Sequence, residues 1–71
     1  MAFDYSKLRG RIVEVFGNQK KFSEAYGISE NTMSLKMSNN VRFTSDDIIR
    51  ISEMLNIPKE EIGSYFFTKK V

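Results

Sequence analysis

The side chains with the clearest chemical use lie close together between residues 29 and 38. Four of them are polar groups on or next to one predicted helix and the fifth is a neighbouring leucine: Ser29, Glu30, Asn31, Ser34 and Leu35. An asparagine amide can pair bidentately with adenine, a glutamate can accept from the amino group of cytosine, and a leucine can contact a thymine methyl. These five residues are therefore candidates for contact with base edges in the major groove of DNA.

A second set of residues around this helix carries cations or amides, which can neutralise or hydrogen-bond phosphates without reading sequence. The candidates for contact with the DNA backbone are Gln19, Lys20, Lys36, Asn39, Asn40 and Arg42. These groups also have a plainer explanation as solvated surface, just as Ser29 is also a helix cap and Glu30 a first-turn charge. The roll of the helix decides whether Leu35 or Lys36 faces outward, and the sequence leaves both open.

Two short helices joined by a tight turn must position these groups. The pattern predicts one helix over about 19–26, capped by Asn18, and a second, after the cap Ser29, over about 30–37. Gly27 supplies the left-handed conformation that ends the first helix. So short a turn implies a steep crossing, the geometry of a helix-turn-helix that presents its second helix to the major groove.

Three further helices complete a compact all-α domain of five helices over residues 1–71. Their starts are predicted at Asp4, which we expect to cap the first helix, at Thr44 and at Pro58. We expect the fifth helix to end near Ser64. Spacing predicts this buried set: Leu8, Ile12, Val15, Phe16, Phe22, Ala25, Tyr26, Met33, Met37, Phe43, Ile48, Ile51 and Leu55.

The last seven residues, 65–71, combine three aromatic residues with β-branched ones, which favours an extended strand. This tail either packs on the first helix and buries at least one phenylalanine, or it pairs with the tail of a second chain.

Composition narrows the classes of function. The 71 residues contain no cysteine and no histidine, which removes the usual zinc sites, the common nucleophile pairs and the commonest general base. We therefore expect no metal, no cofactor and no enzyme activity. No stretch approaches the roughly 20 apolar residues of a membrane span, and the first residues lack the apolar core of a signal peptide, so we expect a cytoplasmic protein without a membrane partner.

Charge is segregated along the chain. Residues 1–21 carry five basic and two acidic side chains, whereas residues 43–67 carry two basic and five acidic ones. The basic end suits a polyanion, although an ordinary solvated surface explains the same pattern.

Several residues of the two-helix segment resemble a known family. Gln19 opens the first helix, a small residue, Ser23, follows it, and Gly27 lies in the turn. Together with Ile28, Ser29 and Met33, this pattern resembles the small phage and prophage repressor and Cro-type helix-turn-helix (XRE-like) proteins. The resemblance implies a lambda-repressor-like five-helix fold whose third helix enters the major groove.

These features together predict a sequence-specific DNA-binding transcriptional regulator of phage Cro or repressor type, with double-stranded operator DNA as its partner. A helix of about eight residues reads too few base pairs alone, so we expect a homodimer that is weak when free and assisted by DNA. The alternative is a protein-interaction module on the same scaffold, an antirepressor or the partner of a larger regulator. Exposed aromatic rings at Tyr65, Phe66 and Phe67 would indicate this alternative.

Overall fold

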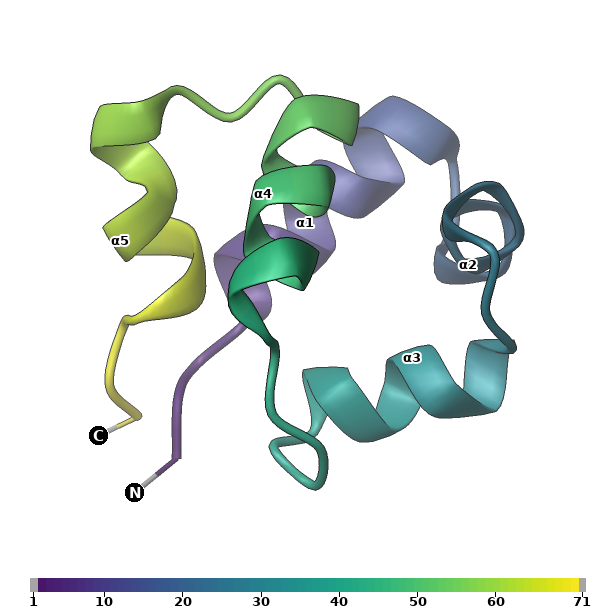
Figure 1. Cartoon of the computed structure of the whole chain (residues 1–71), viewed down its shortest axis with the longest axis horizontal. Coiled ribbons are helices and arrows are strands. Elements are labelled where there is room, and N and C mark those ends of the chain that lie inside the picture. Colours follow the sequence, from purple (N-terminus) through teal and green to yellow (C-terminus); the bar gives the residue numbers. More distant parts are fainter. Residues whose placement is uncertain (1, 71) are drawn as a thin grey trace.

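Five α-helices and one turn of 3-10 helix make up most of residues 2–70, the part of the chain that the computed structural model describes (Figure 1). The elements are α1 (Ser6–Phe16), α2 (Gln19–Tyr26), α3 (Glu30–Met37), α4 (Ser45–Met54), the 3-10 turn η1 (Lys59–Glu61) and α5 (Ile62–Phe66). The prediction of a compact, all-helical fold is confirmed.

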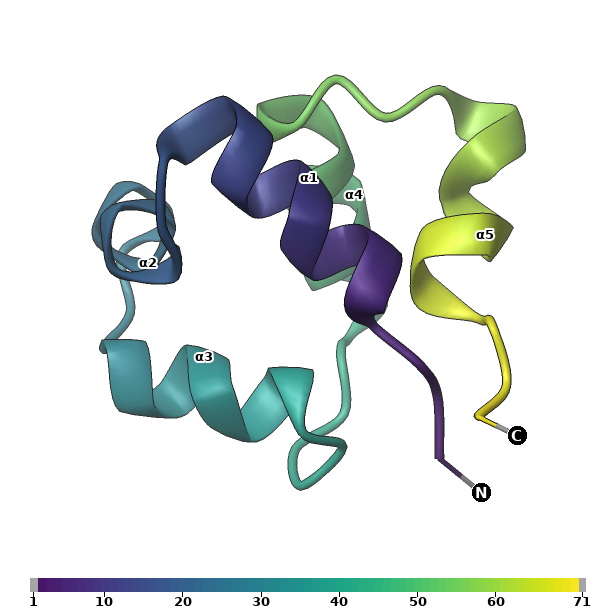
Figure 2. The same cartoon turned by 180° about the vertical axis from the view of Figure 1, so that it is seen from behind.

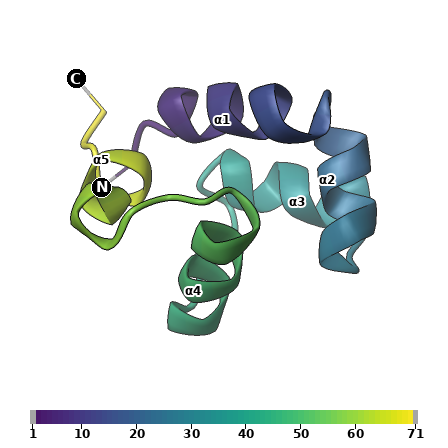
Figure 3. The same ribbon diagram turned by 90° about the horizontal axis from the view of Figure 1, so that it is seen from above.

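The helices pack around one hydrophobic core. α4 lies in front of α1 in Figure 1 and behind it in Figure 2, so the two helices lie on opposite faces of the molecule. The view from above shows α5 at one end and α2 at the other (Figure 3). α3 runs along one edge, and the turn after α2 leads directly into it.

Side-chain caps define where three of the helices begin. The Asn18 side chain accepts from the backbone N–H of Lys21 at 2.8 Å, and Ser29 accepts from the N–H of Thr32 at 3.1 Å. Thr44 and Asp47 form a reciprocal capping box at the start of α4. Between α2 and α3, Gly27 has the left-handed φ of 96° that the turn requires. The predicted boundaries of α2 and α3 and all three caps are confirmed.

Helix α1 begins one residue later than predicted. Asp4 does not cap it: Tyr5 holds the cap position, and the Asp4 carboxylate accepts from the N–H of Ser6 at 2.8 Å instead. The reason lies in the preceding backbone, where the Asp4 N–H donates to the carbonyl of Thr68 at 2.7 Å and is held in an extended segment.

The tail is shorter than predicted because α5 continues through Tyr65 and Phe66. After it, Lys69 forms a single antiparallel bridge with Phe3, so the two ends of the chain pair with each other (Figure 1). Phe66 is 1% exposed, which confirms that one phenylalanine of the tail packs into the core.

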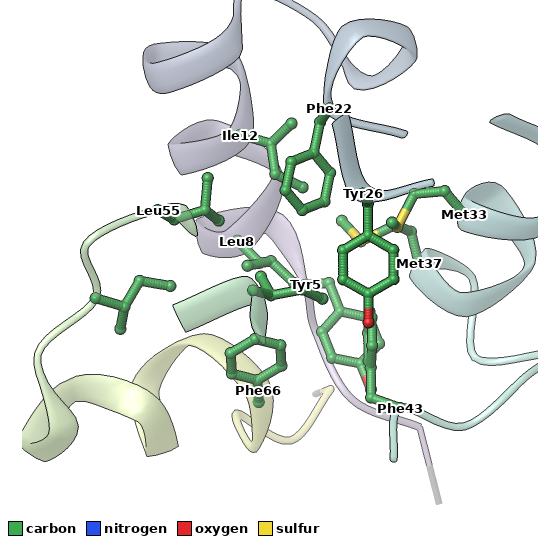
Figure 4. Packing of buried hydrophobic residues seen from close by; sticks show 12 residues of the cluster. Tyr5, Leu8, Ile12, Phe22, Tyr26, Met33, Met37, Phe43, Leu55 and Phe66 are labelled. Atoms are coloured by element: carbon green, nitrogen blue, oxygen red, sulfur yellow. The ribbon is translucent and has the colours of Figure 1, made fainter. Parts of the chain in front are cut away.

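All five α-helices contribute to one hydrophobic core (Figure 4). The buried apolar side chains are Tyr5, Leu8, Ile12, Phe22, Tyr26, Met33, Met37, Phe43, Ile51, Leu55, Ile57 and Phe66. Four residues that were predicted to be buried are not fully buried. Phe16 and Ile48 are half-buried, and Val15 and Ala25 are exposed. α1 buries a narrow i, i+4 stripe, and Val15 falls outside it.

Candidate functional site

The roll of α3 turns Leu35 outward and Lys36 inward. Leu35 is 38% exposed, whereas the Lys36 side chain is 12% exposed and its ammonium lies 2.9 Å from a carboxylate oxygen of Asp47 on α4. The same ammonium lies 5.8 Å from the centre of the Phe43 ring. Lys36 is the one basic residue of α3, so the outer face of this helix has no uncompensated cation.

Asp47 joins three parts of the fold. Its carboxylate accepts from the hydroxyl of Tyr26 on α2, from the ammonium of Lys36 on α3, and from the N–H of Thr44 at the start of its own helix. Arg50, one turn further along α4, stacks on the Tyr26 ring at 4.2 Å and donates to the Tyr26 carbonyl at 2.9 Å. These contacts fix the position of α2 and α3 relative to α4.

These contacts shift the pKa values of Asp47 and Tyr26 in opposite directions. Burial alone would raise the pKa of Asp47, but the hydrogen bonds from Tyr26, Thr44 and Lys36 outweigh burial and hold it well below its ordinary value of 3.8. Burial and the hydrogen bond to Asp47 raise the pKa of Tyr26 from 10.0 to about 12. At neutral pH the pair is therefore a carboxylate and a protonated phenol.

Stability should decline as the pH rises from 10 to about 12. The folded state holds the neutral form of Tyr26, so this contribution is complete below the unfolded pKa and is lost as the pH rises through the folded one. The Asp47 contribution has the opposite sign: it is present above the unfolded pKa and is lost as the pH falls. Urea unfolding across the pH range should show a smaller alkaline decline for Tyr26→Phe than for the wild type, and identical declines would contradict this assignment.

Three of the amide candidates are bound within the molecule. Gln19 donates to the Ser34 hydroxyl at 2.9 Å, which ties α2 to α3. The Asn39 side chain accepts from the N–H of Phe3 and donates to its carbonyl, both at 2.9 Å, and so clamps the N-terminal segment to the loop after α3. Asn40 donates to the Ser38 hydroxyl at 2.8 Å.

The remaining candidates lie on the surface. Ser29, Glu30 and Asn31 are exposed at the start of α3, where Ser29 caps the helix and shares a 2.8 Å hydrogen bond with the Thr32 hydroxyl. Lys20 is exposed at the start of α2, and Arg42 is exposed beyond the far end of α3. The structure therefore gathers the base candidates along α3, with Gln19 bonded to Ser34, Asn40 bonded to the Leu35 carbonyl and Lys36 on the same helix, whereas Lys20 and Arg42 lie on other elements. Contact of these residues with DNA stays a prediction.

A hollow of about 440 Å³ lies beside the loop after α3 and was not foreseen from the sequence. Its lining comes from distant parts of the chain: Phe3, Tyr5, Asn39, Val41, Arg42, Phe43, Ile48, Phe66 and Phe67. In the sequence, the only indication of this hollow is the aromatic residues near both ends of the chain. The Phe3–Lys69 bridge, the hydrogen bond from Asp4 to Thr68 and the Asn39 clamp on Phe3 bring them together.

Comparison with known proteins places the chain in a family. Residues 1–69 match the family model described as a protein of unknown function, DUF739. The chain belongs to this family. Among solved structures, it is similar to the solution structure of the modulator of repression (MOR) of the temperate bacteriophage TP901-1 from Lactococcus lactis, with 41% identity, a TM-score of 0.84, and coverage of 100% of this chain and 96% of that one. A comparison with curated proteins found no match.

These findings correct the expected family and function. The chain was predicted to be a Cro-type or XRE-like DNA-binding repressor, and this is wrong, because both matches lead to DUF739 and to a modulator of repression. The physical reason is that the motif residues serve the fold. Ser23 is buried and donates to the Gln19 carbonyl at 2.9 Å, Gly27 makes the turn, and Met33 is buried. Such residues are needed wherever two helices meet through this turn, whatever the outer face binds.

None of the helices within residues 2–70 is long and apolar enough to cross a membrane. No three or more Asp or Glu side chains in this part of the chain are grouped so that they could hold a metal ion.

Proposed function

We propose that this chain is a protein-interaction module that modulates repression by binding a larger regulator of phage type. The observation that carries the proposal is its 41% identity, over its whole length, to a phage modulator of repression. The match covers 100% of this chain and 96% of the matched one, so the likeness concerns the helical fold rather than a single motif.

The outer face of α3 supports the proposal. It carries Leu35, 38% exposed, beside the exposed small polar residues Asn31 and Ser34. Val41 follows in the loop, is 39% exposed, and donates its N–H to the carbonyl of Leu35 at 3.1 Å. Protein interfaces combine an apolar centre, few charges and a polar rim. A DNA-binding surface instead needs free cations, and Lys36 is neutralised by Asp47.

Leu35→Glu should weaken binding to the repressor from the same genome at least about tenfold, because a charge at the centre of an interface must lose its hydration without finding a partner. The fold should be unaffected, since the Leu35 side chain is exposed and glutamate is a good helix former. Val15→Glu is the matched control: it makes a similar change at a 41% exposed position on α1 and should leave binding unchanged.

Biolayer interferometry with the immobilised repressor measures both variants. Equal weakening by the two substitutions would show that α3 is not the contact. Absence of binding by the wild type would overturn the proposed function, as would tight, salt-dependent binding of the isolated chain to operator DNA.

A further inference from the structure

The hollow beside the loop after α3 is walled by a continuous series of aromatic rings. Phe67 meets Phe3 edge-on with ring centres 5.8 Å apart, and Phe3 lies 6.4 Å from Tyr5. Tyr5 meets Phe43 edge-on at 5.2 Å, and Phe43 meets Phe66 at 5.5 Å. In Figure 4 the labelled members Tyr5, Phe43 and Phe66 lie at the same end of the core. A volume of about 440 Å³ is within the range of ligand-binding pockets.

The Tyr5 hydroxyl is an accessible polar group in this wall. Tyr5 is 8% exposed as a whole residue and lines the hollow, and its hydroxyl is not one of the buried polar atoms that lack a partner within residues 2–70. The hydroxyl can therefore exchange a water for an incoming acceptor. Burial raises the pKa of Tyr5, so the hydroxyl keeps its proton at neutral pH and can donate.

The charges around the hollow favour an anion. Arg42 lines the hollow, is exposed, and lies close enough to Tyr5 for its charge to act on the phenol. A smaller adjoining hollow of about 90 Å³ shares Phe3 and Tyr5 and is also lined by Arg9 and Lys70. The Asp4 carboxylate lines this smaller hollow as well, and its charge interacts with Lys70 and Arg9. The lining of the larger hollow contains Arg42 and no carboxylate. In the larger hollow an incoming carboxylate would therefore meet the Arg42 guanidinium and the Tyr5 hydroxyl.

The exposed rim favours an apolar stem on that anion. Phe67 is 52% exposed and Val41 is 39% exposed, and both line the hollow. A phosphate of DNA has no apolar part to cover these groups, whereas a protein segment with an acidic residue beside a large apolar one has both. Val41 also joins the hollow to the outer face of α3 through its hydrogen bond to Leu35.

We propose that this hollow is the docking site for an acidic segment of the partner protein. A carboxylate of that segment binds the Tyr5 hydroxyl and the Arg42 guanidinium, and a neighbouring apolar side chain packs on Phe3 and Phe67. This inference rests on the proposed function, because the partner is the regulator that the α3 face contacts.

A small probe tests the chemistry of the hollow directly. 3-Phenylpropionate carries one ring and one carboxylate, and its titration into the isotope-labelled full chain should shift the amide resonances of Val41, Arg42 and Phe67. Tyr5→Phe and Arg42→Gln should each weaken this binding about tenfold or more, because each removes one hydrogen bond to a charged group. Tyr5→Phe keeps the ring that packs in the core, and Lys20→Gln is the matched control, since it removes an exposed cation elsewhere.

Several results would overturn the proposal. Equal binding of 3-phenylpropionamide would show that the carboxylate is not recognised. The same shifts with inorganic phosphate would identify a phosphate site, and the same shifts on raising the concentration of the chain alone would identify a second copy as the occupant.

Repressor binding then separates this inference from the proposed function. We expect both variants to bind the repressor at least about tenfold more weakly than the wild type does. If the wild type binds and both variants bind equally well, the docking site is wrong and the proposed function stands. If the wild type does not bind, both fail.

Discussion

Phe66→Ala should lower the free energy of unfolding by about 4 kcal/mol, because it empties a fully buried ring position in a small core. Phe66 is 1% exposed, and its ring meets that of Phe43 edge-on at 5.5 Å. A domain of this size has a total stability of roughly 4–10 kcal/mol, so the loss would leave much of the chain unfolded at ordinary temperatures. Urea unfolding followed by far-UV circular dichroism measures the change.

The neighbouring ring provides the control. Phe67 is 52% exposed, so Phe67→Ala removes the same number of atoms from a position that stays largely in water. We expect a loss below about 1 kcal/mol, chiefly from its edge-on contact with Phe3. Similar losses for the two variants would mean that the end of the chain does not complete the core. The same Phe67→Ala variant removes one wall of the hollow while leaving the fold intact.

Local signals in the sequence predicted much of the fold. Caps at Asn18, Ser29 and Thr44 and the left-handed Gly27 act through contacts within a few residues, so their types and spacing place the helix boundaries directly. The start of α1 was missed because the Asp4 backbone is bound to Thr68, a contact across 64 positions that no local pattern carries.

The candidate site could be predicted only in part, for the same reason. The polar groups on α3 were found because they lie within one helix. The neutralisation of Lys36 depends on Asp47, which is 11 residues away on another helix. The hollow depends on residues from both ends of the chain and from the loop between α3 and α4. The spacing of neighbouring residues predicts neither which side chain pairs with a charge nor that the segments near the two ends of the chain lie side by side.

The error in function has the same physical origin. The motif residues serve contacts within and between α2 and α3, so they indicate the scaffold and not its ligand: Gln19, Ser23, Gly27 and Met33. The ligand depends on the outer face, where the balance of free and compensated charge decides between a polyanion and a protein. The sequence does not show this balance of charge, because it does not show that the Lys36 ammonium pairs with the Asp47 carboxylate.

Asp47→Ala should destabilise the fold by about 3 kcal/mol, because it leaves the largely buried Lys36 ammonium without its counter-charge. The substitution also removes the acceptor for the Tyr26 hydroxyl and for the Thr44 N–H. The adjacent Asp46→Ala is the control: Asp46 is exposed, so we expect a change within about 0.5 kcal/mol.

A second substitution separates the charge from the other contacts of Asp47. In the double variant with Lys36→Met, no unpaired ammonium remains, and methionine fills a similar volume beside the Phe43 ring. The double variant should therefore be more stable than Asp47→Ala alone, whereas Lys36→Met in the presence of Asp47 should be destabilising. Urea unfolding of the four proteins gives the coupling energy. A coupling energy near zero would mean that the two charges do not stabilise each other. Lys36 would then be an available cation on α3, which would contradict the proposal that this face contacts a protein.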